Sequence, residues 1–287
     1  MRVFNYGSIN IDHVYRVPVF VQPGETRAVS SYQRFLGGKG ANQSLALARA
    51  GASVAHVGAV DTDSEWVVDE LRASGVDVDA IARIETPTGH AIIQVDDAGE
   101  NCILIAAGAN GCLDLESLDA VLRTADAQDW LLLQNETNQV VEAARLAKQH
   151  GLKVAYNPAP FDADATAEML PNLSLLIVNG SEFDALTASL GDALPSDIDL
   201  LITHGAQGAE IRADGDQLFV PARKVDVVDT TGAGDTFIGY FLASVGAGLD
   251  RVSALERATA ASALCVGKAG AAVSIPSAEA VDKLLGS

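Results

Sequence analysis

Cysteine is scarce in this chain of 287 residues. Only Cys102, Cys112 and Cys265 are present, an odd number without the spacing of metal ligands. A chain of this length can bury a substantial apolar core, so it does not need disulfides to fold. We therefore expect three reduced thiols, a cytoplasmic protein, and one large α/β unit that spans residues 1–287.

Long apolar runs are also absent. No stretch of about 18 apolar residues occurs, and Asp12 interrupts the N-terminal segment before a secretory apolar region could form. These features argue against a transmembrane helix and a signal peptide. They predict a protein that does not act at a membrane.

Basic residues are outnumbered. Nineteen lysines and arginines stand against thirty-eight acidic residues, which gives a net charge of −19. Such a surface repels nucleic acid and anionic lipid, so we expect neither as a partner. Only six of the basic residues are lysine, a balance that would also suit a salty cytoplasm.

What the chain does contain is a glycine-framed helix start, Val228–Phe237. The turn Gly232-Ala233-Gly234 precedes an apolar run that ends at Gly246, which indicates one buried helix. Free amide groups and the helix dipole make such a start suitable for an anion, and Asp235 would stand beside it as a base. The alternative, that Asp235 only favours the helix dipole, leaves the two glycines and the upstream Asp229 unexplained.

Two familiar phosphate-binding motifs do not fit the glycine runs. A dinucleotide fingerprint needs a small residue where Phe237 stands, and it should follow an N-terminal strand. A Walker loop ends in Gly-Lys-Ser or Gly-Lys-Thr, which neither Gly232–Gly234 nor Gly37–Gly40 provides. The chain is therefore neither a Rossmann dehydrogenase nor a Walker-type nucleotidase.

Polar residues follow a first strand predicted at Arg2–Tyr6. Gly7-Ser8 ends this strand and leads to Asn10 and Asp12, near the strand's carboxyl end, where ligands bind in open α/β sheets. An amide and a carboxylate together suit vicinal hydroxyls. An Asx turn is the structural alternative.

A second glycine run, Gly37–Gln43, opens a predicted helix that ends at Ala50-Gly51. Lys39 at this helix start opposes the dipole, a mild cost that favours a functional role. We expect Lys39 and Asn42 to face an oxygen-rich ligand.

Strands and helices alternate in the middle of the chain. We predict strands at 54–60, 130–134, 152–156 and 175–178, and helices at 63–74, 138–150 and from 181 to about 190. This alternation predicts a three-layer α/β/α core with a mostly parallel sheet. Glu136, Asn157 and Asn179 follow strand ends and should converge on one edge of that sheet.

The helix start after Asn179 carries Glu182, which could orient a hydrated Mg²⁺ or merely favour the helix dipole. The segment Thr203–Gly208 breaks a strand with two glycines, which would let a flat ligand approach the backbone. His204 in this segment is expected to be structural.

Two extended stretches interrupt the alternation, at about 13–35 and 89–106. Together they predict a small β sheet that forms a lid over the main sheet. An exposed apolar lid face would invite a second copy of the chain, so we expect a homodimer through the lid.

The two glycine motifs, Gly37–Gln43 and Asp229–Asp235, resemble those of the ribokinase (PfkB-type) family of carbohydrate kinases. The resemblance continues through Gly7–His13, Pro23–Thr26, Ala107–Asn110, Asn157–Pro160 and Asn179-x-x-Glu182, and so covers essentially the whole chain. It implies a ribokinase-like α/β/α core with a β lid and ATP-dependent phosphorylation of a sugar hydroxyl.

The resemblance also implies roles for individual residues. Asp235 would be the catalytic base, with Gly232, Ala233 and Gly234 as an anion hole. The sugar would be bound by Asn10, Asp12, Gly38, Lys39, Asn42 and Glu136, and ATP with Mg²⁺ by Asn179, Glu182, Thr203 and Gly205. A monovalent cation, usually K⁺, would be held by Asp229, Thr231, Cys265, Lys268, Gly270 and Ser274.

The leading expectation is transfer of the γ-phosphoryl group of ATP to the primary 5-hydroxyl of D-ribose. Fructose, a keto-deoxy acid or adenosine are alternative acceptors, and the polar set Asn10, Asp12, Lys39 and Glu136, without an aromatic ring, favours a polyol over a nucleoside. A sugar-binding relative without turnover is the alternative from another class.

Overall fold

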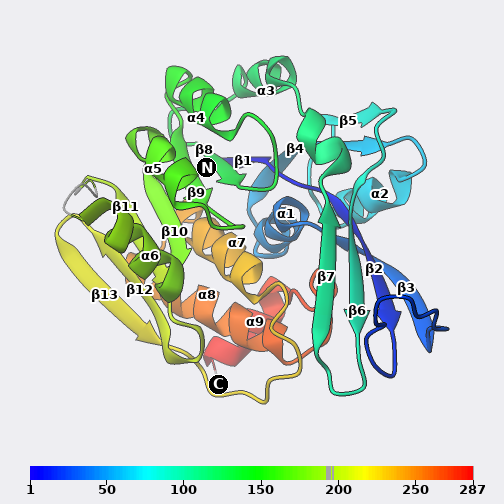
Figure 1. The fold of residues 1–287 in the computed structure, drawn as a ribbon. Coiled ribbons are helices and arrows are strands. Elements are labelled where there is room, and N and C mark those ends of the chain that lie inside the picture. Colours follow the sequence, from blue (N-terminus) through cyan, green and yellow to red (C-terminus); the bar gives the residue numbers. More distant parts are fainter. Residues whose placement is uncertain (192–194, 196, 287) are drawn as a thin grey trace.

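The computed structural model describes residues 1–191, 195 and 197–286 and contains two sheets. The larger has nine strands in the order β13-β12-β11-β10-β9-β8-β1-β4-β5 (Figure 1). Its strands are β1 Arg2–Tyr6, β4 Ser53–Asp61, β5 Ile81–Ile84, β8 Trp130–Gln134, β9 Lys153–Asn157, β10 Leu175–Asn179, β11 Asp199–Thr203, β12 Gly208–Ala213 and β13 Asp216–Pro221. Among the described strands of this larger sheet, the pairings β11–β12 and β12–β13 are antiparallel and the others are parallel. This confirms the predicted α/β class with a mostly parallel sheet.

Helices cover both faces of the large sheet (Figure 1). Alternate residues of one strand face opposite layers: in β8, Leu132 belongs to one apolar cluster, and Leu131 and Leu133 belong to the other. On the Leu132 side are α1 Lys39–Arg49, α2 Glu65–Ala73, α7 Ala233–Gly246, α8 Arg251–Val266 and α9 Ala278–Gly286. The opposite cluster takes in α3 Leu115–Leu122, α4 Val140–Gln149, α5 Ala163–Met169 and α6 Gly180–Leu190. The described residues also include the short helical turns η1 Gly108–Cys112, η2 Leu170–Asn172 and η4 Gly205–Gln207.

The smaller sheet has four strands in the order β3-β2-β6-β7. These are β2 Asn10–Arg16, β3 Ser31–Gly37, β6 Gly89–Val95 and β7 Asn101–Ala106. It stands beside the core as a separate layer, and both extended stretches noted in the sequence contribute to it (Figure 1). We call this sheet the lid.

Some element boundaries differ from those expected. The helix predicted at 138–150 begins at Val140, because Gln139 has a left-handed backbone (φ 56°) and cannot belong to the helix. The helix predicted at 63–74 begins at Glu65. The sequence patterns gave no indication of β5, α3 or α5. Among the described residues, no helix has both the length and the apolar character needed to cross a membrane.

Candidate active site

Asp235 lies in the first turn of α7 and is buried, with 9% of its surface exposed. Two side chains of α1 donate hydrogen bonds to its carboxylate: Gln43 Nε2 to Oδ1 at 2.9 Å and Asn42 Nδ2 to Oδ2 at 3.2 Å. Burial raises the pKa of Asp235, whereas the charge of Lys39 and the two amide donors oppose the rise. The carboxylate is thus a partly desolvated base with a fixed orientation.

Asn42 has a buried oxygen without a hydrogen-bond partner. It is buried, and its Oδ1 has no hydrogen-bond partner although Nδ2 is bonded to Asp235. A buried carbonyl oxygen without a partner costs free energy, so this atom is suited to accept a ligand hydroxyl. It lies on the same side chain that contacts Asp235.

Glu136 is joined to the start of α1. Its Oε2 accepts the backbone N–H of Lys39 at 3.0 Å and the hydroxyl of Ser8, and Ser8 Oγ in turn accepts the N–H of Gly40. These bonds satisfy helix amides that lack intrahelical partners. Glu136, predicted from the end of β8, is therefore held beside Lys39 by the dipole of α1.

Asn10 and Asp12 lie in the lid strand β2, not in a loop at the end of β1. The reason is the short turn Gly7–Ile9, which passes the chain directly from one sheet to the other. Asn10 is buried, and its Oδ1 accepts Nδ2 of Asn110 at 2.7 Å. Burial, with a smaller contribution from Glu136, raises the pKa of Asp12 to about 6.

Two glycines make room for this arrangement. A Cβ on Gly37 would lie 2.2 Å from Oδ2 of Asp12, so only glycine leaves space for that carboxylate. Gly38 has φ +89°, and its Cβ would be 2.9 Å from the backbone nitrogen of Asn10. Close backbone approach therefore requires glycine at position 38, and its sugar-binding role stays a prediction.

The turn at the start of α7 differs in detail from the expected anion hole. Gly232 is left-handed (φ 76°) and is the N-cap, while the N–H of Ala233 donates to Thr230 O at 3.2 Å. The next amides, of Gly234 and Asp235, belong to the first helical turn and lack intrahelical acceptors. A Cβ on Gly234 would meet nothing within 4 Å, so this turn faces open space.

Two cavities adjoin that turn and share Thr203, Thr230 and Gly234. One, of about 260 Å³, joins Asp235 and Lys39 to Asn157, Asn179 and Glu182. The other, of about 670 Å³, extends past Gly205 between Val225, Val227 and Val266. It also contains Thr259, a buried residue whose Oγ1 has no partner. An apolar slot with an unpaired hydroxyl, beside free helix amides, fits a flat base attached to an anionic chain.

Asn179 and Glu182 form a capping box. Asn179 Oδ1 accepts the N–H of Glu182 at 2.9 Å, and Glu182 Oε2 accepts the N–H of Asn179 at 2.8 Å. This interaction explains both residues structurally. They nevertheless line the 260 Å³ cavity with Asp235.

The residues proposed for a monovalent cation come from the loop before α7 and from the end of α8 with the loop that follows it. Asp229 Oδ2 accepts the N–H of Gly270 at 2.8 Å, and Cys265 Sγ lies 3.0 Å from Ser274 Oγ. Burial opposes the lowered pKa of Asp229, but hydrogen bonds from Thr231 and Gly270 outweigh it. The carbonyl of Cys265 accepts the N–H of Lys268 at 3.1 Å. The six residues are therefore neighbours, and several of their oxygens already have protein donors.

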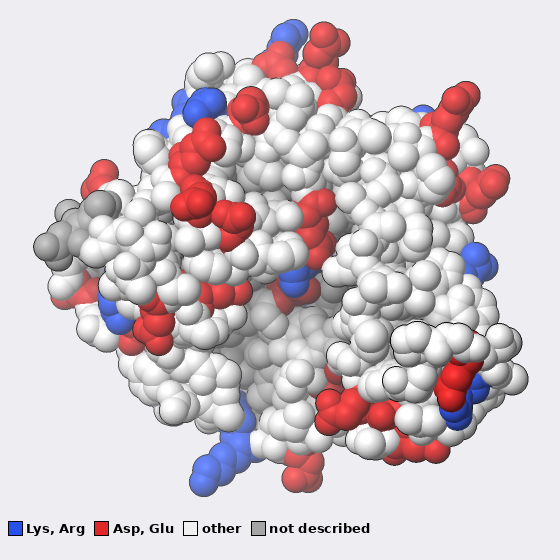
Figure 2. Space-filling view, in the orientation of Figure 1, with Lys and Arg blue, Asp and Glu red and all other residues white. Residues whose placement is uncertain are grey.

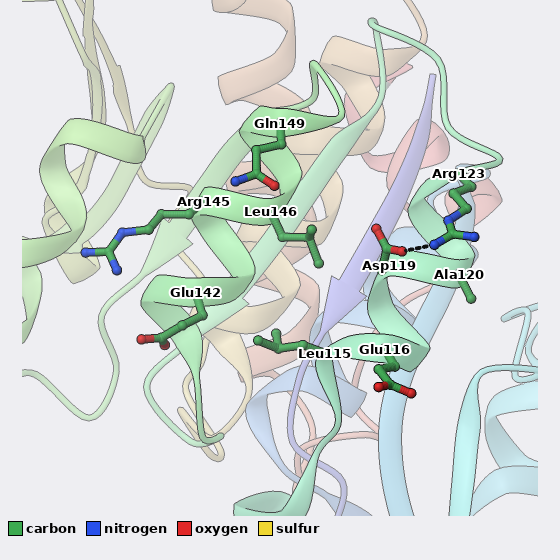
Figure 3. Close-up of a pocket in the computed structure, with 9 residues that line it drawn as sticks. All are labelled: Leu115, Glu116, Asp119, Ala120, Arg123, Glu142, Arg145, Leu146 and Gln149. Carbon is green, nitrogen blue, oxygen red and sulfur yellow. Dashed lines mark hydrogen bonds and ion pairs between the residues drawn. The ribbon is translucent and has the colours of Figure 1, made fainter.

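A further cavity, of about 760 Å³, lies between α3 and α4 and contains none of the predicted residues (Figure 3). Within it Asp119 accepts from Arg123 at 2.5 Å, and none of its side chains is linked to Asp235. The chemistry is concentrated elsewhere, where core and lid meet. Figure 2 shows a hollow on that face, with acidic and basic side chains at its margin.

Sequence reasoning missed the role of two residues. Gln43 contacts Asp235 directly, and Asn110 holds Asn10 and accepts the N–H of Ile9 at 2.9 Å. Both stand inside the motifs that carry the family resemblance. Their partners are about 100 or more positions away, so only the fold reveals what they contact.

Comparison with known proteins agrees with this site. The model of the pfkB family carbohydrate kinases matches residues 2–278. The chain is 37% identical to the ribokinase of Haemophilus influenzae, over 94% of each chain. It is 31% identical to the ATP-dependent ribose-1-phosphate kinase of Halopiger xanaduensis, over 99% of this chain and 98% of the relative. The structure of Arabidopsis thaliana ribokinase complexed with ribose and ATP superposes with a TM-score of 0.87 at 27% identity, covering 99% and 98% of the two chains. Its sequence, its fold and these matches together establish that the chain belongs to the pfkB family of carbohydrate kinases.

Proposed function

We propose that this enzyme transfers the γ-phosphoryl group of ATP to the primary 5-hydroxyl of D-ribose. The observation that carries the proposal is the Asp235 carboxylate, which is held by Gln43 and Asn42 beside the unpaired Oδ1 of Asn42. The similarity to ribokinases, one of them complexed with ribose and ATP, supports ribose as the acceptor.

Asp235 acts as the general base in this proposal. It accepts the proton of the attacking hydroxyl on a carboxylate lone pair that Gln43 and Asn42 do not use. Asn42 Oδ1 accepts a hydrogen bond from the sugar, and the charge of Lys39 stabilises the carboxylate before transfer. Phosphoryl transfer depends mainly on such positioning and electrostatics, so no covalent enzyme intermediate is needed.

The cavities beside the α7 turn suit the nucleotide. The first-turn amides of Gly234 and Asp235 would bind phosphoryl oxygens, and the apolar slot that contains Thr203 and Gly205 would hold the base. Asn179 and Glu182 would orient Mg²⁺ through water, because Glu182 is already engaged in its capping box. Bound Mg²⁺ would neutralise phosphate charge during transfer.

A neutral sugar is the acceptor that the charges favour. The six proposed sugar-binding residues include two carboxylates, Asp12 and Glu136, and one cation, Lys39. A phosphorylated or carboxylated sugar would bring a further negative charge to this acidic set. Ribose is therefore preferred here over ribose 1-phosphate or a keto-deoxy acid.

The Asp235→Asn variant tests the base. We expect the turnover number to fall by about 10²–10⁴-fold, while calorimetry still detects ribose binding and the melting temperature is preserved. Turnover near that of the parent would overturn the assignment. Ribose binding without ATP consumption by the parent itself would instead indicate a sugar-binding protein.

An acceptor panel tests the sugar. Ribose, ribose 1-phosphate, fructose, 2-keto-3-deoxygluconate and adenosine are compared by ADP release. A tenfold higher kcat/KM for any acceptor other than ribose would contradict the ribose assignment.

We also propose that K⁺ is bound by Asp229, Thr231, Cys265, Lys268, Gly270 and Ser274. Repeating the panel with K⁺ replaced by tetramethylammonium tests this proposal, which predicts higher activity with K⁺.

We also propose that the lid closes over the sugar and joins two copies of the chain. Leu104 and Ile105 in β7 are 65% and 60% exposed, as expected of a face that a second subunit covers. Sedimentation should give a dimer for the parent and a monomer for Leu104→Asp. A monomeric parent at micromolar concentration would contradict this.

With ATP as substrate and three free cysteines, the chain is proposed to be cytoplasmic.

A further inference from the structure

A chain of buried amides lies beneath Asp235. It runs from Asn5 in β1 through Gln134 in β8 to Gln43 in α1, and all three residues have no exposed surface. Gln134 Nε2 donates to Asn5 Oδ1 at 2.9 Å and to Gln43 Oε1 at 2.8 Å. Buried polar networks of this kind are costly unless their members are paired, so their arrangement is informative.

The orientation of Asn5 is fixed at two points. Its Nδ2 donates to the carbonyl oxygen of Gly40 at 2.7 Å, an atom that can only accept. It also donates to Ser44 Oγ at 2.8 Å. The proton of His56 is on Nε2, which donates to Gly7 O at 3.1 Å, so Nδ1 is an acceptor. Ser44 therefore donates its single hydroxyl proton to His56 Nδ1, 2.8 Å away, and can only accept from Asn5.

This arrangement requires a neutral His56 ring with its proton on Nε2. Burial lowers the pKa of His56 to about 4, so the ring carries one proton at neutral pH. Asn5 Oδ1 must then face Gln134, and Gln134 must present its amino group to both neighbours. The orientation of Gln43 follows, with Oε1 toward Gln134 and Nε2 toward Asp235.

We propose that Gln43 is a positioning residue for the base, oriented by this amide chain so that Asp235 always receives a donor on Oδ1. Gln43 Nε2 also lies 3.3 Å from Asn157 Oδ1, so the same amino group links the base to the end of β9. The inference rests on the proposed function of Asp235 and adds to it. Asn42 donates to the other oxygen, so each carboxylate oxygen has a fixed donor and keeps its remaining lone pair for the proton.

The Gln43→Met variant removes the donor and keeps the length of the side chain. We expect kcat to fall about 10–100-fold, since a misplaced base loses the alignment for transfer, while the KM for ribose changes less than about threefold. The acid limb of the pH–kcat profile should move about one unit higher, because loss of a donor raises the pKa of Asp235.

Ser244→Ala is the matched control. Ser244 is also fully buried and lies on α7 with Asp235, but its hydroxyl donates to Tyr240 O at 2.7 Å and does not contact the base. It should lower the melting temperature without moving the acid limb. A Gln43→Met enzyme that behaves like this control, with the parent's kcat and pH profile, would overturn the inference.

Gln134→Met supplies a second route should Gln43→Met fail to fold. It frees Gln43 Oε1, so the Gln43 amide can rotate. We expect the acid limb of the pH–kcat profile to move in the same direction as in Gln43→Met, but less. A pH–kcat profile like that of the parent would count against the inference. The carboxyl carbon resonance of Asp235, titrated without substrate, reports the same pKa change independently of turnover. Asp235→Asn separates the two ideas, because its full activity would overturn the base itself and not only its positioning.

Discussion

Two apolar strands of this protein have opposite environments. β8 has the sequence WLLLQ and all five residues are buried, whereas β7 has the sequence NCILIA and all six are exposed. β8 lies between β1 and β9 with helices on both faces, and β7 is an edge strand paired only with β6. Apolar composition alone does not fix burial, because neighbours decide it.

The same contrast divides the site. Asp235, Asn42 and Gln43 stand on helices packed against the core, where hydrogen bonds fix them. Asp12 stands on the lid, which has little core of its own. The thinly packed lid would therefore open at lower cost than the core, and such an opening would leave the hydrogen bonds to Asp235 in place.

The largest expected effect comes from truncating the buried strand. Leu132 is 0% exposed at the centre of β8, so Leu132→Ala should lower the free energy of unfolding by about 2–5 kcal/mol. Urea denaturation followed by circular dichroism measures this. A loss below about 1 kcal/mol would mean that the scaffold is as loosely packed as the lid.

Gly239→Ala tests how closely the two site-bearing helices approach. A Cβ at Gly239 in α7 would lie 2.4 Å from the Cβ of Ala46 and 2.8 Å from the backbone nitrogen of Leu47 in α1. We expect a loss of about 1–3 kcal/mol in thermal unfolding, and a lower kcat because α1 and α7 separate. Gly111→Ala, where a Cβ meets nothing within 4 Å, is the control and should change neither.

The Asp12→Asn variant tests how a carboxylate on the lid changes the stability of the protein with pH. The folded-state pKa of Asp12, about 6, lies above the value of 3.8 usual for an aspartate, so the folded state binds its proton more tightly in that interval. The charged form therefore destabilises the fold at pH 8, and Asn should raise the unfolding free energy there by about 1–2 kcal/mol. This advantage should shrink as pH falls from 6 toward 3.8, while ribose affinity is weakened. An advantage that does not change over pH 4–8 would contradict the assignment.

The smallest effect is expected in the exposed strand. Leu104→Ala, measured at a concentration where the protein is monomeric, should change the free energy of unfolding by less than about 0.5 kcal/mol. Chemical denaturation of the dilute protein provides the measurement. A cost comparable to that of Leu132→Ala would show that β7 is covered within one chain.

Much of the fold was accessible from local patterns. The strands β1 and β8 are short apolar runs, and the start of α7 follows a glycine turn; all three occur where expected. α3 was missed although Leu115, Leu118 and Leu122 have helical spacing and Asp114 caps the helix, because its eight residues make only about two turns. The partners of Gln43 could not be predicted, since Gln134 and Asp235 are 91 and 192 positions away.

The sequence by itself determined the glycine turn that starts α7, the alternation of strand and helix and the family, because these depend on local propensity and on motifs within a few residues. Tertiary structure alone decided that β7 is exposed and β8 buried, that Glu136 caps α1, and that an amide chain orients Gln43. Those outcomes depend on which distant groups meet, since a hydrogen bond requires its two atoms to come within about 3 Å whatever their separation in the chain.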